Sequence, residues 1–200
     1  MNKKPILIVA GEPYSIFSEI FFKSLKKLNQ KRPLVLIASK SIFLEQMKKL
    51  GYKYQFKTID KRLSQKISNK KKVINIIDVE FKFIKIFDKI SDKSNKYISD
   101  CFLIANNLLR NKKAYALING PISKKNFLKD RYLGITEYLS KMNNVKNFAM
   151  LIYNKSFSVS PITTHIALKK VSSQISKKKI ISQVYLIKKF YNSLFKKNVK

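Results

Sequence analysis

Short apolar runs alternate with stretches of helical periodicity along most of this 200-residue chain. Continuous apolar runs such as 33–38 are typical of strands in a parallel sheet that is covered on both faces. We therefore expect an α/β fold with a largely parallel sheet and flanking helices. The expected strands are 6–10, 33–38, 54–60, 73–79, 114–119, 148–153 and 156–163, and the expected helices are 16–29, 41–50, 91–113, 124–129, 136–142 and 177–195.

The composition limits the class of protein. Apolar residues make up 45% of the sequence, which is enough for a buried core. The longest apolar runs are far shorter than the roughly 20 residues that cross a bilayer, so we expect no contact with a membrane. The N-terminal segment MNKKPILIVAGEP predicts a strand rather than a signal peptide. The single cysteine, Cys101, excludes disulfides and favours a packed thiol in a reducing cytoplasm.

The charge is strongly positive, at +32. Such a field attracts phosphorylated small molecules, and it binds polyanions through phosphate contacts and counterion release. The lysines are spread through nearly every segment and heavily outnumber the arginines, whereas sequence-reading proteins favour the bidentate arginine fork. We therefore expect nucleic acid to bind only non-specifically, with most lysines on solvated faces.

Glycine is scarce, and two of the four glycines directly follow expected strands. Gly11 and Gly120 lie where the carboxyl ends of parallel strands meet and where ligands bind in α/β sheets. Neither loop matches the G-x-G-x-x-G fingerprint or the P-loop. Ser123 is an expected helix N-cap, and Lys124 beside it suggests an anion site, although a solvated surface lysine is the alternative.

Four segments in a fixed order carry a family resemblance. They are GEPYSIFSEI (11–20), ALINGPISKKNFL (116–128), GITEYL (134–139) and AMLIYNKSFSVSPITTHIALKKV (149–171). Together they resemble the 4-hydroxythreonine-4-phosphate dehydrogenases of vitamin B6 synthesis, which have a G-D-P-x-G-I-G-P-E-I element, a GPI(N)K loop, a G-H-T-E segment and a T-T-H segment. The resemblance implies a fold like that of the isocitrate and isopropylmalate dehydrogenases, incomplete at the C-terminus. We expect residues 1–125 to form the first part of the α/β domain and residues 126–200 to begin a second, truncated α/β subdomain.

The resemblance also implies an activity. Family members oxidise 4-phosphohydroxy-L-threonine with NAD or NADP, and decarboxylation then gives 3-amino-2-oxopropyl phosphate on the way to pyridoxal 5'-phosphate. A divalent cation (zinc, magnesium, cobalt or manganese) binds the substrate hydroxyl and stabilises the enolate. The active site lies between two subunits, which implies a homodimer in the cytoplasm.

Particular residues inherit roles from this resemblance. His165, in T-T-H, is the expected metal ligand, and Thr136, in GITE, is an expected substrate-binding residue with Lys124 as a weaker one. The alternatives are a structural histidine capped by threonine hydroxyls at a strand end, and a threonine that caps a helix. No catalytic residue is assigned.

Two departures from the family pattern bear on function. Ile135 stands at the substrate-binding position where the family has histidine, and an isoleucine can neither donate a hydrogen bond nor take a proton. The family's N-P-H and Y-H-D-Q segments, which supply its other metal histidines, do not occur in this sequence. We therefore expect an N-terminal portion of a family member that does not turn over substrate alone. The alternatives are a catalytically inactive descendant that keeps the fold, and a basic polyanion-binding protein.

Overall fold

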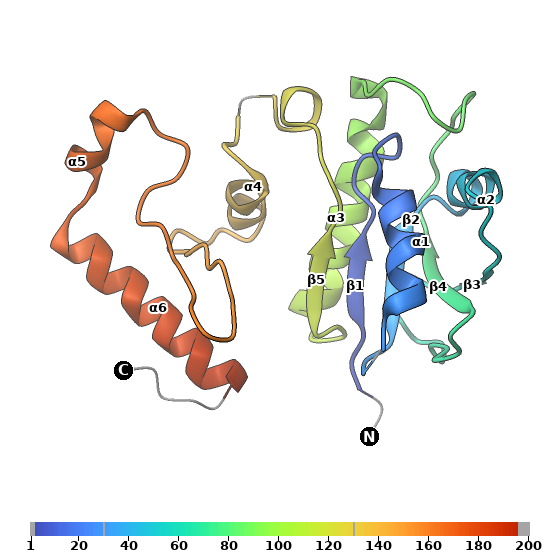
Figure 1. Ribbon diagram of the computed structural model, residues 1–200, viewed down its shortest axis with the longest axis horizontal. Helices are drawn as coiled ribbons and strands as arrows, with labels where there is room; N and C mark the ends of the chain where they lie inside the picture. The colour runs from blue at the N-terminus through green and yellow to red at the C-terminus, as the bar shows by residue number, and fades with distance from the viewer. Residues whose placement is uncertain (1–2, 30, 130, 196–200) are drawn as a thin grey trace. The chain divides into compact units, whose positions relative to one another are not determined.

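The computed structural model describes residues 3–29, 31–129 and 131–195 (Figure 1). The chain divides into two compact units, Met1–Lys129 (unit 1) and Asp130–Lys200 (unit 2). Each unit is described by itself. Within the described ranges, no helix combines the length and the apolar character needed to span a lipid bilayer.

Unit 1 is built on a five-stranded sheet in which every neighbouring pair is parallel. The strand order is β3-β4-β2-β1-β5. The strands are β1 (Ile6–Val9), β2 (Leu34–Ala38), β3 (Gln55–Thr58), β4 (Val73–Asp78) and β5 (Ala116–Asn119). This arrangement confirms the predicted α/β fold with a parallel sheet.

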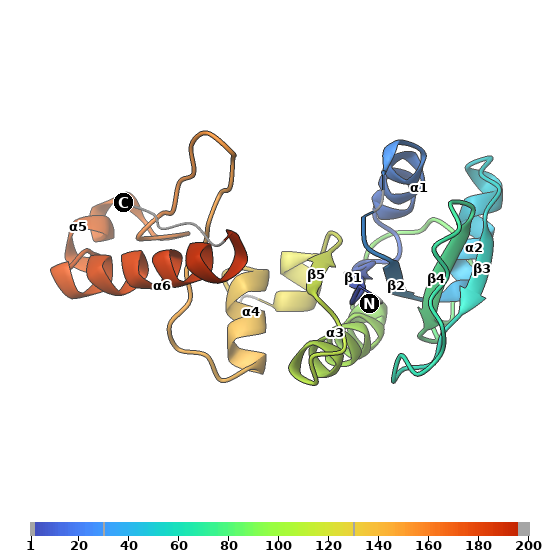
Figure 2. The same cartoon turned by 90° about the horizontal axis from the view of Figure 1, so that it is seen from below.

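Helices cover both faces of this sheet, which explains the apolar sequences of its central strands. α1 (Phe17–Lys27) packs against α2 (Lys40–Lys49), whereas α3 (Asn95–Arg110) contacts β1, β2 and β5. Figure 2 shows α1 and α3 on opposite faces of the sheet. A 3₁₀ turn (Asp92–Ser94) precedes α3, and a π-helical turn (Lys124–Leu128) follows β5.

Aromatic side chains form much of the core between α1 and α2. Phe22, which is fully buried, stacks on Tyr52 at a centroid distance of 5.2 Å and packs against Phe43 at 5.9 Å. Gly51, which follows the C-cap residue of α2, has φ = 72°. There the N–H groups of Gly51 and Tyr52 donate to the carbonyls of Lys48 and Met47, the hydrogen-bond pattern of a Schellman motif.

Unit 2 contains α4 (Ile135–Met142), a 3₁₀ turn (Leu168–Lys170), α5 (Val171–Gln174) and α6 (Lys177–Phe195). The prediction of strands at 148–153 and 156–163 is wrong: the two segments meet only at one antiparallel bridge, between Ile152 and Val159. Within the described part of unit 2, no third strand lies beside them. Since two short strands alone are marginally stable, the apolar pattern is not sufficient to form a sheet here.

Candidate functional site

The loops after β1 and β5 lie against each other at the carboxyl edge of the sheet in unit 1. Gly11 has φ = 76°, and a Cβ atom there would collide with the carbonyl oxygen of Pro121. A Cβ atom at Gly120 would collide with the carbonyl oxygen of Ala10. The N–H of Glu12 donates to the Pro121 carbonyl at 2.8 Å. Both glycines are therefore required by the close approach of the two backbones.

Glu12 is a buried carboxyl group at this edge, with only 1% of its surface exposed. Burial raises its pKa, while the hydroxyl of Ser94, which donates to Oε2 at 2.7 Å, works in the opposite direction. Ser94 directly precedes α3, but its hydroxyl does not cap the helix, because it donates to Glu12 and to the Ser91 carbonyl instead. This contact links the β1–α1 loop to the start of α3.

The predicted cap at Ser123 is present. Its Oγ accepts a hydrogen bond from the N–H of Asn126 at 3.0 Å. The element that it caps is a five-residue π-helical turn, which is too short to focus a helix dipole on an anion. Lys124, the first residue of this turn, is exposed.

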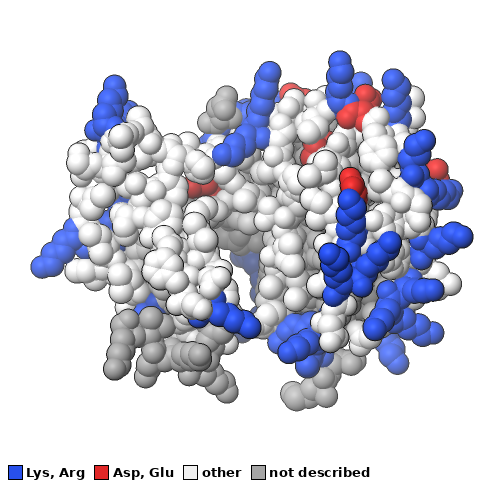
Figure 3. Space-filling view, viewed as in Figure 1, with Lys and Arg blue, Asp and Glu red and all other residues white. Residues whose placement is uncertain are grey.

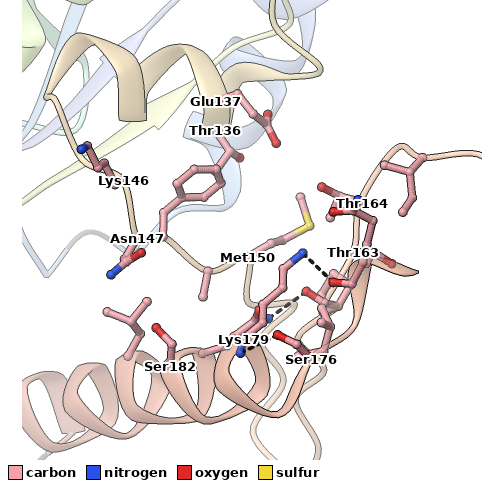
Figure 4. A pocket seen from close by; sticks show the side chains of 18 of the residues that line it. Thr136, Glu137, Lys146, Asn147, Met150, Thr163, Thr164, Ser176, Lys179 and Ser182 are labelled. Atoms are coloured by element: carbon pink, nitrogen blue, oxygen red, sulfur yellow. Dashed lines mark hydrogen bonds between the residues drawn. The ribbon is translucent and has the colours of Figure 1, made fainter. Parts of the chain in front are cut away.

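Unit 2 contains a pocket of about 500 Å³ that brings two of the family-like segments together. Thr136, the second residue of α4, lies on one side of it, and Thr163 and Thr164 line another (Figure 4). α6 contributes Lys179 and Ser182. The GITE and TTH segments, separated by more than twenty residues in sequence, thus share one concave surface.

The lining of this pocket combines apolar and polar side chains, and its charged groups are mainly basic. Lys146, Lys178 and Lys179 line it together with one carboxylate, Glu137. Lys179 Nζ donates to the Gln174 carbonyl at 3.3 Å. Hydroxyl donors from the threonines and ammonium groups from the lysines are the groups that bind a phosphorylated, hydroxylated small molecule.

Gln183 of α6 holds the SPITTH segment in place. Its side-chain Nε2 donates to Ser160 Oγ at 2.6 Å and to the Pro161 carbonyl at 2.8 Å. It is the only buried residue in the described part of unit 2. A buried amide with two hydrogen-bond partners fixes the position of the backbone just before Thr163 and Thr164, which form one side of the pocket.

His165 lies next to this side of the pocket but does not itself line the pocket. It is exposed and has φ = 54°. The expectation that it sits at a strand end is wrong, because the chain around it is a loop that follows the isolated bridge at Val159. Its neighbours Thr164 and Ile166 both line the pocket.

The other predicted site residues are distributed over both units. Ile135 is the half-buried first residue of α4 and does not line the pocket. Thr136 is not a helix cap, because Gly134 occupies the cap position. Lys124 belongs to unit 1, whereas Thr136 and His165 belong to unit 2.

A complete metal site is not formed by the part of the chain that the structure describes, where no three His, Cys, Asp or Glu side chains cluster. His165 therefore fits a divalent metal only as one ligand of a larger set.

Sequence reasoning did not identify Lys146, Lys179 and Gln183 as site residues. Lysine occurs throughout this chain, so no single lysine stands out. Gln183 lies within a regular helical repeat, and its partners are 22 and 23 residues away.

Comparison with known proteins shows which family this chain resembles. The model of the pyridoxal phosphate biosynthetic protein PdxA matches residues 29–199. The 4-hydroxythreonine-4-phosphate dehydrogenase of Sulfurihydrogenibium sp. (strain YO3AOP1) is 35% identical over 193 residues, which are 95% of this chain and 58% of that protein. The protein of the same name from Aquifex aeolicus is 28% identical over 98% of this chain and 60% of its own length.

The fold agrees with these sequence matches. The crystal structure of 4-hydroxythreonine-4-phosphate dehydrogenase from Klebsiella pneumoniae superposes with a TM-score of 0.82 at 22% identity, covering 95% of this chain and 60% of that one. The chain thus spans about 60% of the length of these relatives. With most of its residues matched by one family model, the chain belongs to the PdxA family of pyridoxal phosphate biosynthetic proteins.

Proposed function

We propose that this chain carries the substrate-binding pocket of a 4-hydroxythreonine-4-phosphate dehydrogenase. The observation that carries the proposal is the pocket in unit 2, in which Thr136 faces the same space as Thr163 and Thr164. Its lysines supply positive charge for a phosphate group, and its hydroxyls match a hydroxylated substrate. The names of the relatives at 35% and 28% identity support the same substrate class.

The proposed reaction is the oxidation of 4-phosphohydroxy-L-threonine with NAD or NADP, followed by decarboxylation. A divalent cation would polarise the substrate hydroxyl in this chemistry. Since the described residues contain no three-ligand cluster, we assign to this chain only one candidate ligand, His165. We propose that turnover needs the part of the family's length that this sequence does not span.

A catalytically inactive descendant is the second candidate, and Ile135 favours it. The family's histidine at this position is replaced by a side chain without a polar atom. Ile135 directly precedes Thr136, which lines the pocket, so Ile135→His would put an imidazole beside the pocket. A binding-competent enzyme portion should then gain affinity for 4-phosphohydroxy-L-threonine, whereas a descendant that has lost substrate binding should show none with either residue.

Isothermal titration calorimetry with 4-phosphohydroxy-L-threonine tests the pocket assignment. We expect saturable binding by the wild-type chain and at least a tenfold loss in Thr136→Val, about the effect of leaving one polar contact unmade. Thr58→Val is the matched control, because Thr58 lies on β3 in unit 1 and should leave the affinity unchanged. Equal affinities for all three proteins, or no binding by the wild type, would overturn the assignment. NAD reduction by this chain alone is expected to be absent, and robust turnover would contradict the need for further residues.

We also propose a cytoplasmic homodimer, on the basis of the family resemblance. Light scattering of the purified chain should give twice the mass of 23.4 kDa. A single-chain mass at micromolar concentration would refute self-association by this portion.

A further inference from the structure

A second concave surface lies in unit 1, at the amino ends of its strands. Its walls are the segment before β1, the turn before β2, the loop between β3 and β4 and the turn before β5, and its volume is about 640 Å³. Ligands of α/β sheets bind at the opposite, carboxyl edge. We call this surface the amino-edge groove; it is distinct from the pocket in unit 2.

The amino-edge groove is lined by six cations: Lys3, Lys4, Lys31, Arg32, Lys66 and Lys113. Among its described lining residues there is no Asp or Glu. In Figure 3 Lys and Arg side chains appear over the whole visible face of unit 1, whereas its acidic side chains appear in the upper half of the view. Like charges gathered without acidic partners repel one another, and bound polyanions relieve that repulsion.

The walls of the groove are held in position by contacts within unit 1. Arg32 lies over the ring of Tyr115 at 3.8 Å from its centroid. Buried Asn75 accepts a hydrogen bond from Ser68 N at 2.7 Å and donates to Ser68 O at 2.9 Å, and Asp60 accepts from Ser64 Oγ at 2.8 Å. The β3–β4 loop is therefore fixed from both ends. Cations on a fixed frame lose less conformational entropy on binding than cations on a loose loop.

The lining also indicates which feature of a polyanion is recognised. No aromatic side chain is among the lining residues that the structure describes, and Arg32 lies over one face of the nearby Tyr115 ring. Base stacking is thus not provided, so the contacts fall on phosphates. A groove of this volume admits an extended single strand more readily than the broad convex surface of a duplex.

We propose that the amino-edge groove binds the phosphodiester backbone of single-stranded nucleic acid without reading its sequence. The chemistry that it recognises is a linear series of phosphate groups, which inorganic polyphosphate shares. Six cations predict a salt slope of about −4 in log–log form, that is, an affinity loss of about 300-fold between about 50 and 200 mM salt.

The test is fluorescence anisotropy with a labelled oligothymidylate, comparing two triple variants of the full chain. The groove variant is Lys31→Gln, Lys66→Gln and Lys113→Gln, all of which are exposed. The control variant is Lys85→Gln, Lys89→Gln and Lys125→Gln, exposed lysines that follow β4 and β5 beyond the carboxyl edge. Both variants remove the same charge, and thermal unfolding verifies that both remain folded.

The groove variant should have a slope of about −2 and bind about 100-fold more weakly at about 0.1 M salt, while the control should stay close to wild type. Equal losses in the two variants would overturn the proposal, because binding would then follow net charge alone. Tighter binding of a duplex of equal length would also overturn it. Polyphosphate should displace the oligonucleotide from the wild type, and its failure to do so would contradict recognition of the phosphate chain.

Discussion

Gly11 and Gly51 have nearly the same backbone conformation, with φ of 76° and 72°, but different surroundings. A Cβ atom at Gly51 meets nothing within 4 Å, whereas a Cβ atom at Gly11 collides with the Pro121 carbonyl. We expect Gly51→Ala to lower the free energy of unfolding by about 1–2 kcal/mol, the cost of a left-handed residue. Gly11→Ala should cost clearly more, as measured by urea denaturation. Equal losses for Gly11→Ala and Gly51→Ala would show that the loop after β1 is not in contact with the loop after β5.

Glu12 makes stability depend on pH. Its folded-state pKa is raised by burial, so the folded chain binds this proton more tightly than the unfolded chain does. The resulting stabilisation is complete below the unfolded pKa of 4.5 and is lost as the pH rises through the folded pKa. Glu12→Gln, which keeps an acceptor for Ser94, should therefore be more stable than wild type at neutral pH. This advantage should shrink as the pH falls towards 4.5 in urea titrations, and an advantage that grows on acidification would contradict the burial of Glu12.

Cys101 is expected to be unreactive in the folded chain. It is fully buried in α3, and burial raises the pKa of its thiol to about 12. Ellman's reagent at about pH 8, near the pKa of a free thiol, should modify it slowly in buffer and rapidly in guanidinium. Rapid modification of the folded chain would place the thiol at the surface.

The role of a residue could be predicted from the sequence where its residue type is rare in the chain. Gly11 and Gly120 stood out because only four glycines occur in the chain. The contact between Glu12 and Ser94 joins residues 82 positions apart, and no local pattern marks Ser94 rather than Ser91 as the partner of Glu12. Only the packing of the β1–α1 loop against α3 distinguishes Ser94 from Ser91.

At the scale of elements, Gln183 is the link between α6 and the wall of the pocket. Gln183→Leu removes both hydrogen bonds to Ser160 and Pro161, which should destabilise this contact by about 1–3 kcal/mol. Hydrogen exchange should then show lower protection at 160–166 and unchanged protection in unit 1. Gln55→Leu, at an exposed glutamine of β3 in unit 1, is the control and should leave 160–166 unaffected. Unchanged exchange in Gln183→Leu would refute its positioning role.

Most elements of unit 1 could be predicted because β1, β2, β4 and β5 are short, mainly apolar runs bounded by turn residues. Together with the more polar β3 they pair in one sheet. The apolar run at 148–153 and the more polar segment at 156–163 were also expected to be strands, but they pair with each other at one bridge only. The periodicity of apolar residues indicates which side chains can be buried. A strand also requires neighbouring strands to pair with, and a local sequence pattern does not show whether these are present.

At the scale of the whole molecule, the two units differ in how far they bury their apolar residues. Unit 1 has a continuous core that includes Phe22, Phe43 and Phe102, whereas Ile152, Phe157 and Leu168 of unit 2 are each more than 60% exposed. The family assignment could be made from four motifs in order, because together they span both units. The shape of the pocket could not be predicted from the sequence, since it depends on how α6 packs against two loops.

The most direct test of the proposed pocket uses the fact that His165 is the only histidine in the chain. Its imidazole gives one set of NMR signals, and its neighbours Thr164 and Ile166 line the pocket. Titration with 4-phosphohydroxy-L-threonine should shift these signals saturably, and Thr136→Val should require at least a tenfold higher concentration for the same shift. Signals that do not move at millimolar substrate, or that move equally in Thr136→Val, would contradict a pocket shared by the GITE and TTH segments.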